Sequence, residues 1–469
     1  MSDIDVAKKY LEKEEAESVV SEEVNYSHVL RKVDLHIMPI VMAIYFFQFL
    51  DKALLNYSAV MGIKKNLKGN EFANLGTIFN VAYIIGEPIS GYLLQRFPLA
   101  KTFTCAIVGW AIVVACHAAC HTYASLMVMR VLLGLFESST VIALVSITGM
   151  YYTRSEQSKR IGIWAAQAGT ATIIGGLMSF AFQHVNSSVL EAWQILFMVF
   201  GIITFLFGGV IYLCLPDNLA NAKFLTELEK RALVEHVRDN QTGIENKKFK
   251  WEQVKELLFG DVLTWLMFVL TITSQIVTGS LGTFSTTVVA TFGFSNKDAA
   301  LLQIPIGVMI VICCVCPAWL VSRYGSFTII HISTYVPSIA GAGMLFSHGQ
   351  LTQLFGLYLL YPGSCAITLL YVWNGANTAG HTKRIFRNAV TMVAFGVANI
   401  IGPQLFQANT APRYVPAKIT ILVTQAVSIL LSIAVGYICR QRNNSRPPVE
   451  SYTFDDSTDL QNPSFRYLW

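Results

Sequence analysis

Two oppositely charged residues lie inside an otherwise apolar stretch of the chain. Arg130 and Glu137 interrupt the run from Ser125 to Tyr151, which is long enough to cross a bilayer, since a membrane helix needs roughly 20 apolar residues. They are one heptad apart, so they share a helix face and lie about 10 Å apart along its axis. A charge at the centre of a membrane helix costs at least ~2.5 kcal/mol. This favours a site in the protein interior, with a structural ion pair between helices as the alternative.

A second acid–base pair, Asp51 and Lys52, lies in the apolar segment 35–58. If the helices are regular, Asp51, Lys52 and Arg130 have about the same depth, and Glu137 is closer to the midplane. Four ionisable groups on two helices are too many for a lipid-facing surface, so we expect a hydrated cavity between helices. A structural ion pair near the membrane interface is the alternative for Asp51 and Lys52.

The residue types indicate two kinds of chemistry. Lys52 and Arg130 could hold an anion, the first as a compact point charge and the second as a planar fork. A carboxyl group in a low-dielectric cavity can exchange protons near neutral pH, because burial disfavours its charged form and a nearby cation favours it. Glu137 is the first candidate for the proton-carrying group, and Asp51 is the second.

Other polar residues in apolar segments are candidates for solute binding or gating. Asn374 and Asn377 lie one helical turn apart, so both could present hydrogen bonds to a solute. Glu87 precedes Pro88, which removes a backbone hydrogen bond and can kink the helix, so we assign Glu87 to gating or structure. The residues that could line a cavity are Trp164, Gln167 and Gln404. Hydrogen bonding between helices is the alternative role for such residues.

About twelve membrane-length segments must position these residues. Hydrophobic residues make up 54% of the chain and charged residues 13%, whereas soluble domains carry about 25% charged residues. We predict an all-α polytopic membrane protein with six spanning helices in residues 35–215 and six in residues 261–440. The remaining parts are a disordered N-terminal tail (1–34), a polar linker (216–260) and a polar C-terminal tail (441–469).

The basic residues of the short loops predict the orientation. They are more frequent on the side that holds the N-terminus, and this side is cytosolic by the positive-inside rule. Both tails and the linker are therefore expected in the cytosol. Asn186 then lies in an outer loop, within the sequence Asn186-Ser187-Ser188 of a glycosylation acceptor.

A short loop pattern recurs in the two predicted halves. Its residues are Gly91, Arg96 and Lys101 after the second segment, and Arg323 after the eighth. Here the chain resembles the major facilitator superfamily, whose loop between helices two and three reads Gly-x-x-x-Asp-Arg-x-Gly-Arg-Arg/Lys. This resemblance implies the major facilitator fold and a gating role for these residues. Gln95 and Pro98 stand where the family has Asp and Gly, so the acid of the family's gating salt bridge is replaced by an amide here.

Further motifs are similar to those of the anion:cation symporter family, and within it to the fungal allantoate-permease branch. The motifs are Leu50-Asp51-Lys52, Arg130 to Glu137, and residues 83–88, 374–384 and 401–404. The resemblance implies that Lys52 and Arg130 bind the anion and that Glu137 and Asp51 couple it to protons. Many relatives have arginine where Lys52 stands, so this chain offers a point charge in place of a planar fork at that position.

The expected function is proton-coupled import of a small organic anion, such as an allantoate- or ureidosuccinate-like carboxylate, by alternating access. The alternatives are another solute of the same family (a vitamin such as nicotinate or pantothenate, cysteine, a dipeptide or a sulfonate), or a nutrient sensor that does not transport. An enzyme is not expected, because no HExxH, GxSxG or close His/Cys group falls in a predicted span.

The expected partners are the solute, protons and the lipid bilayer, with no metal, cofactor or nucleic acid. We expect a monomer in the plasma membrane, with a vacuolar or other internal membrane as the alternative.

Overall fold

The computed structural model describes residues 26–185, 189–242, 250–447 and 457–469. All the regular secondary structure within these ranges is helical, and residues 457–469 contain only turns and irregular segments. The glycosylation acceptor at Asn186 lies outside the described residues. So do most of the N-terminal tail and parts of the linker and the C-terminal tail.

Six membrane-length spans come from the first half of the chain, two of them broken into pairs of helices. They are α2 (Tyr26–Met61), α3 (Glu71–Arg96), α4 (Leu99–His117), α5 (Tyr123–Glu137) with α6 (Ser139–Tyr151), α7 (Arg154–Ala165) with α8 (Gln167–Phe182), and α9 (Ala192–Cys214). Six follow in the second half. They are α12 (Val262–Thr291), α13 (Asn296–Leu301) with α14 (Gln303–Tyr324), α15 (Phe327–Met344), α16 (Gln350–Ser364) with α17 (Ile367–Ala376), α18 (His381–Gln404) and α19 (Val415–Asn444).

Ten of these spans are long and apolar enough to cross a membrane. The other two, α3 with 26 residues and α15 with 18, also have membrane length. This confirms the predicted all-α, multi-pass architecture. Between the halves lie the linker helices α10 (Glu227–Thr242) and α11 (Trp251–Lys255). The limits of the two halves at 35–215 and 261–440 stay a prediction.

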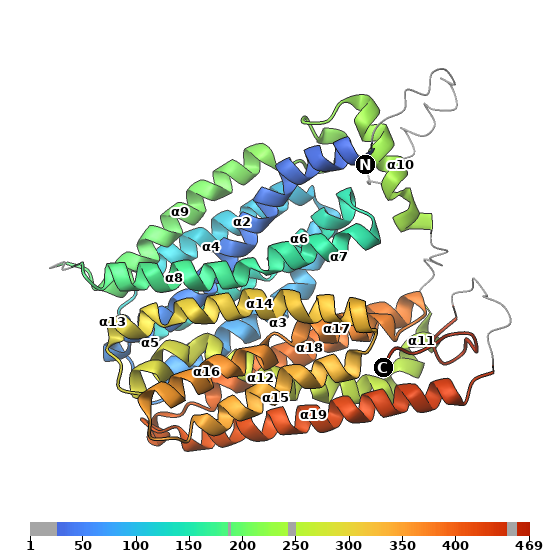
Figure 1. Ribbon diagram of the computed structural model, residues 1–469. Coiled ribbons are helices and arrows are strands. Elements are labelled where there is room, and N and C mark those ends of the chain that lie inside the picture. The colour runs from blue at the N-terminus through green and yellow to red at the C-terminus, as the bar shows by residue number, and fades with distance from the viewer. Residues whose placement is uncertain (1–25, 186–188, 243–249, 448–456) are drawn as a thin grey trace.

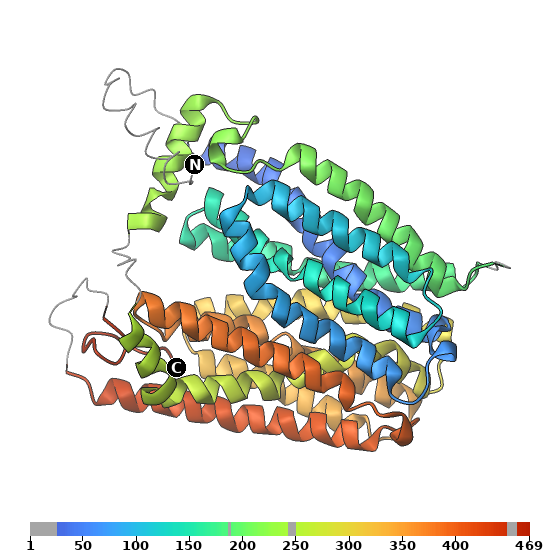
Figure 2. The same ribbon diagram turned by 180° about the vertical axis from the view of Figure 1, so that it is seen from behind.

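The spanning helices run side by side in two groups (Figures 1 and 2). Helices α2, α3 and α8 of the first group pack against α12, α18 and α14 of the second. The start of α2 and the C-terminus lie at the same end of the molecule, near α10 and α11 (Figure 1). An even number of spans requires this arrangement, and both ends are predicted to be cytosolic.

Glycines allow α8 and α14 to approach closely. A Cβ atom added at Gly169 would lie 2.4 Å from the carbonyl oxygen of Gly307, and one added at Gly307 would lie 2.5 Å from that of Gly169. Real side chains cannot occupy such positions. Small residues are the usual device for bringing membrane helices together, and here they join the two halves.

Hydrogen bonds between the halves cluster at the end opposite the termini. Asn56 Nδ2 donates to Ser285 Oγ at 2.7 Å, and the backbone N–H of Thr286 donates to Asn56 Oδ1 at 3.1 Å. Nearby, Lys64 Nζ donates to Thr287 Oγ1 at 2.8 Å. We call this set, Asn56, Lys64 and residues 285–287, the outer clasp. It holds the predicted extracellular ends of α2 and α12 together.

Both predicted tails contain structure where they are described. Helix α2 already begins at Tyr26, so the disordered tail predicted for 1–34 was wrong for its last residues. Asp34 shows why: its Oδ1 accepts from Arg160 Nε and its Oδ2 from Arg160 Nη2, at 2.7 and 2.8 Å. This forked ion pair stabilises the first turns of α2 against α7. At the other end, Tyr467 is buried, so residues 457–469 pack against the protein.

Candidate solute and proton site

Asp51 lies on α2 and is completely buried. Its Oδ2 accepts hydrogen bonds from Trp110 Nε1 of α4 at 3.0 Å and from Thr204 Oγ1 of α9 at 3.2 Å. Its Oδ1 has no hydrogen-bond partner among the described residues. The carboxyl group therefore points into the first half, toward α4 and α9.

Lys52 points in a different direction from Asp51, because neighbouring residues of a helix lie about 100° apart around its axis. Its side chain is only half-buried. The ammonium group lies 5.5 Å from the centre of the Phe79 ring of α3 and within electrostatic range of Glu137 and Glu87. Lys52 is thus the partly accessible cation of the group.

Glu137 is the last residue of α5, and its side chain is completely buried. It lies within electrostatic range of Asp51, Lys52 and Arg130, and Gln48 of α2 lies beside its carboxyl group. Neither carboxyl oxygen of Glu137 has a hydrogen-bond partner among the residues that the structure describes. Burying a charged group without partners is costly, so this site favours either a proton or an approaching cation.

A glycine lets α5 come close to α3 at this point. A Cβ atom added at Gly134 would lie 2.5 Å from the carbonyl oxygen of Phe79. Any side chain there would push α5 away from α3. Gly134 lies one turn before Glu137, so this close packing helps to hold Glu137 near the α2 and α3 side chains.

Arg130 is 2% exposed, and its guanidinium centre lies 5.7 Å from the centre of the Phe197 ring of α9. His117 of α4 stacks on Phe197 with ring centroids 4.9 Å apart. Its Nδ1 lies 2.8 Å from the Val113 carbonyl oxygen. Arg130 Nε, Arg130 Nη2 and His117 Nε2 have no hydrogen-bond partner within the described ranges.

The expected hydrated cavity between α2 and α5 stays a prediction, because most of the charged side chains are buried in this conformation. The structure brings the four charged residues together, but Asp51, Arg130 and Glu137 are buried and only Lys52 is half-buried. The reason is that Asp51 and Arg130 turn toward side chains of α4 and α9 inside the first half.

Four further residues belong to this site and were not predicted from the sequence: Trp110, His117, Phe197 and Thr204. One signal was available, because Trp110 and His117 are seven residues apart and so share one face of α4. Phe197 and Thr204 are also seven residues apart, but their helix is apolar almost throughout, so this spacing does not stand out in the sequence.

The predicted cavity-lining residues lie at separate places. Trp164 is buried against Tyr45, with ring centroids 4.9 Å apart. Gln167 is half-buried at the start of α8. Gln404 Nε2 donates to Asn74 Oδ1 at 3.1 Å and to Thr77 Oγ1 at 2.8 Å. Gln404 therefore links α18 to the outer part of α3.

Asn374 and Asn377 make their hydrogen bonds within the second half. Asn374 donates to Thr391 Oγ1 and accepts from Arg387 Nε, both at 2.6 Å. Asn377 donates to the Leu468 carbonyl oxygen at 2.9 Å and accepts from the Leu468 N–H at 2.7 Å. Both amides are thus engaged by protein groups near the C-terminus and do not join the charges of α2 and α5 in this conformation.

A charged cluster lies beside these asparagines at the predicted cytosolic end of the second half. Lys383 Nζ lies 2.8 Å from both Glu256 Oε1 and Asp459 Oδ1. Asp261 pairs with Arg387 at 3.1 Å and with Arg442 at 2.9 Å. Burial opposes ionisation of Asp261, but the surrounding cations outweigh it and hold the pKa of that carboxyl group below its usual range.

The predicted gating residues lie nearer the helix ends, apart from Glu87. Glu87 is half-buried and within electrostatic range of Lys52. Gly91 is half-buried in α3, and Arg96, Lys101 and Arg323 are exposed. The guanidinium group of Arg323 lies 5.8 Å from the Trp319 ring centre. Their role in gating stays a prediction.

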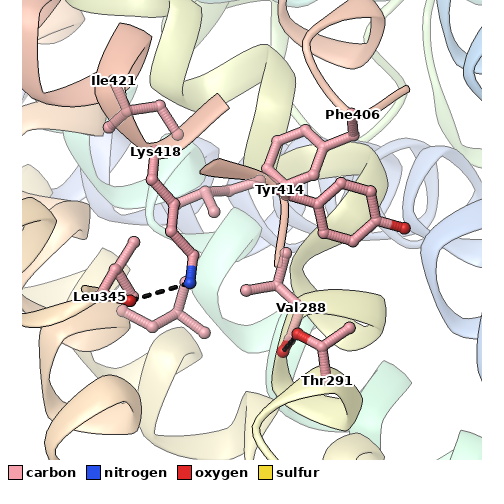
Figure 3. A pocket seen from close by; sticks show the side chains of 9 residues that line it. Val288, Thr291, Leu345, Phe406, Tyr414, Lys418 and Ile421 are labelled. Carbon is pink, nitrogen blue, oxygen red and sulfur yellow. Dashed lines mark hydrogen bonds between the residues drawn. The ribbon is translucent and has the colours of Figure 1, made fainter. Parts of the chain in front are cut away.

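A small pocket lies apart from these charged residues, between α12, α16 and α19 (Figure 3). Its lining is mostly apolar, including Val288, Phe406 and Ile421. The one ammonium group, that of Lys418, donates to the Leu345 carbonyl oxygen at 2.8 Å. We do not assign the solute to this pocket.

Comparison with known proteins gives the family. The model of the Major Facilitator Superfamily matches residues 41–403. The chain is 51% identical to the thiamine pathway transporter THI73 of Saccharomyces cerevisiae, with 100% of this chain and 94% of that protein covered. It is 31% identical to the allantoate permease of the same yeast, with 93% and 85% covered.

A crystal structure of a D-xylose–proton symporter has the same fold, with a TM-score of 0.66 at 14% identity, and covers 86% of this chain and 97% of that one. The two yeast relatives confirm the resemblance to the fungal allantoate-permease branch. The chain belongs to the Major Facilitator Superfamily and is a multi-pass membrane transporter.

Proposed function

We propose that the chain is a proton-coupled symporter that imports a small organic anion by alternating access. The observation that carries the proposal is the group formed by Lys52, Arg130 and Glu137, which interact electrostatically in the interior of the first half. Their charges are of the kinds that an anion and a proton require. Arg130 Nε, Arg130 Nη2 and both carboxyl oxygens of Glu137 have no hydrogen-bond partner among the described residues, so they could bond to a solute or a proton.

Lys52 is the residue that meets the anion first, because it is the half-buried cation of the group. In the absence of solute, its charge favours the ionised form of Glu137. An anion at Lys52 adds a negative charge near Glu137, so the carboxylate becomes less stable and takes up a proton. Anion binding and protonation then favour each other, which is the basis of symport.

The outer clasp fits one state of an alternating-access cycle. It holds the predicted extracellular ends together, so solute in this conformation reaches the site from the cytosolic end. Opening the clasp would give access from outside. Each net positive charge moved inward gains about 2.3 kcal/mol per 100 mV of inside-negative potential. A monoanion must therefore enter with more than one proton if the potential is to drive it. Asp51 is the second proton-carrying group in this proposal.

The test is uptake of radiolabelled solute by cells that express the wild type or Glu137→Gln, with a protonophore as control. Glu137→Gln should abolish proton-driven accumulation and leave counterflow exchange measurable. Accumulation by Glu137→Gln at the wild-type rate and pH dependence would exclude Glu137 from the mechanism. A sensor would bind solute without any uptake.

The relative at 51% identity supports a second candidate solute, one connected with the thiamine pathway. The uptake panel should therefore compare thiamine with allantoate, ureidosuccinate, nicotinate, a dipeptide, cysteine and a sulfonate at acidic and neutral pH. We place the transporter in the plasma membrane as a monomer, with an internal membrane as the alternative. Uptake by intact cells supports the first location.

A further inference from the structure

Four aromatic side chains from four different helices lie near one another. They are Tyr45 of α2, Tyr83 of α3, Trp164 of α7 and Tyr371 of α17. The rings of Tyr45 and Trp164 meet edge to face. The phenol groups of Tyr45, Tyr83 and Tyr371 are close enough to interact electrostatically. We call these four residues the aromatic set.

The aromatic set lies where the two halves of the transporter face each other. Tyr371 belongs to the second half, whereas the other three belong to the first. Tyr45 also lies within electrostatic range of Cys314 of α14. A ligand in contact with the whole set would therefore touch both halves, as a transported solute must.

The aromatic set has unused capacity for a ligand. Tyr45, Tyr83 and Tyr371 are half-buried rather than covered. Trp164 is 4% exposed, yet its Nε1–H has no acceptor among the residues that the structure describes. Buried indole N–H groups normally find an acceptor, so this donor is available to an acceptor atom of a ligand.

The aromatic set continues directly into the charged site. Glu87 lies within electrostatic range of Lys52, Tyr83 and Tyr371. Glu137 lies within the same range of Tyr83. Ring surface, a cation and a hydrogen-bond donor are thus available to one small molecule.

Resting on the proposed function, we propose that the solute is a planar aromatic or heteroaromatic acid. Its ring lies against Tyr45, Tyr83 and Tyr371, and its carboxylate reaches Lys52 and the Trp164 indole N–H. Aromatic faces bind flat rings through offset or edge-to-face contacts in addition to apolar burial. An acyclic anion such as allantoate would leave these faces without a partner. The solute is therefore distinguished by its ring and not by its charge alone.

The first measurement is binding to the purified full-length transporter by calorimetry, which does not depend on transport. The ring-bearing probes are nicotinate, benzoate and 4-hydroxybenzoate, and the acyclic probes are allantoate and ureidosuccinate. At least one ring-bearing acid should bind roughly tenfold more tightly than either acyclic acid, the factor expected from one or two ring contacts. If none of the ring-bearing acids binds more tightly than the acyclic acids, the proposal is overturned.

The second measurement compares variants for the tightest ring-bearing probe. Tyr371→Leu and Tyr83→Leu should each raise its Kd several-fold, whereas Tyr371→Phe keeps the ring and should bind like the wild type. Tyr437→Leu is the matched control, because Tyr437 is 66% exposed on α19. Equal affinity of Tyr371→Leu and the wild type for ring-bearing probes would contradict the proposal. Melting temperatures of all variants show whether each is folded.

Proton-driven uptake of the same probes separates the two proposals. Ring-selective binding without proton-dependent accumulation would overturn symport and keep the ring assignment. Proton-driven accumulation of acyclic acids that ring-bearing acids do not inhibit would keep symport and overturn the ring assignment.

Discussion

At the residue scale, the direction of each side chain decides what the central charges can do. Asp51 and Lys52 are neighbours in sequence, but Asp51 accepts from Trp110 and Thr204 inside the first half, whereas Lys52 lies by Phe79 and is half-buried. In the proposed mechanism we therefore expect the solute to meet the cation and not the acid of this pair.

Replacing Lys52 tests this difference. Lys52→Ala should raise the KM for the anion roughly tenfold or more, because the partly accessible charge is lost, whereas Lys52→Arg should retain most of the affinity. The measurement is the concentration dependence of uptake at fixed pH. Lys65→Ala is a suitable control, since Lys65 is exposed and lies on the predicted extracellular side. Unchanged affinity in Lys52→Ala would refute the anion-site assignment.

At the element scale, the C-terminal segment behaves as part of the second half. Asp459 pairs with Lys383, and the Tyr467 hydroxyl donates to Asp459 Oδ2 at 2.7 Å. Leu468 exchanges backbone hydrogen bonds with the side chain of Asn377. The segment 457–469 thereby connects α17, α18 and the residues before α12.

Breaking the Lys383–Asp459 pair should destabilise the protein. Both side chains are completely buried, and removing one partner of an isolated buried ion pair costs about 3–5 kcal/mol. Lys383 keeps its contact with Glu256 at 2.8 Å, so the cost here is smaller. Asp459→Leu should therefore lower the melting temperature in detergent more than the double variant Lys383→Met with Asp459→Leu does. A double variant less stable than Asp459→Leu alone would show that Lys383 does not depend on Asp459.

The same cluster predicts a pH dependence of stability. The folded protein holds the pKa of Asp261 below its usual range, so the stabilisation from this carboxylate is complete above its unfolded pKa of about 3.9 and is lost as the pH falls through the lower folded value. Melting curves should show a constant gap between wild type and Asp261→Asn from pH 7 to about 5. The gap should shrink only in more acidic solution. A gap that closes between pH 7 and 5 would contradict this assignment.

At the scale of the whole molecule, contacts between the halves decide which side of the membrane the site faces. The outer clasp and the close approach of Gly169 and Gly307 hold the halves together. Transport requires that contacts of this kind open and re-form in each cycle.

Weakening the outer clasp should shift the population toward the conformation that is open to the outside. Asn56→Ala removes the hydrogen bonds to Ser285 and Thr286. The variant Thr283→Cys, in a background without native cysteines, should then react several-fold faster with a membrane-impermeant maleimide than it does when Asn56 is kept. Asn221→Ala, at the cytosolic surface in the predicted orientation, should leave the rate unchanged. An equal rate in Asn56→Ala would show that the clasp does not control access.

The sequence by itself determined the span number, the membrane class and the interior position of Arg130 and Glu137. These features depend on hydropathy and on the cost of charge in lipid, which are local properties of the chain. The family motifs also pointed to the correct superfamily.

Only the tertiary structure decided which side chains meet. Asp51 faces Trp110 and Thr204, which are far apart in sequence, and Asn377 binds the backbone of Leu468. The aromatic set likewise comes from four helices. Such contacts depend on how helices rotate and pack against one another, and a helical period shows which residues share a face but not which helix that face meets.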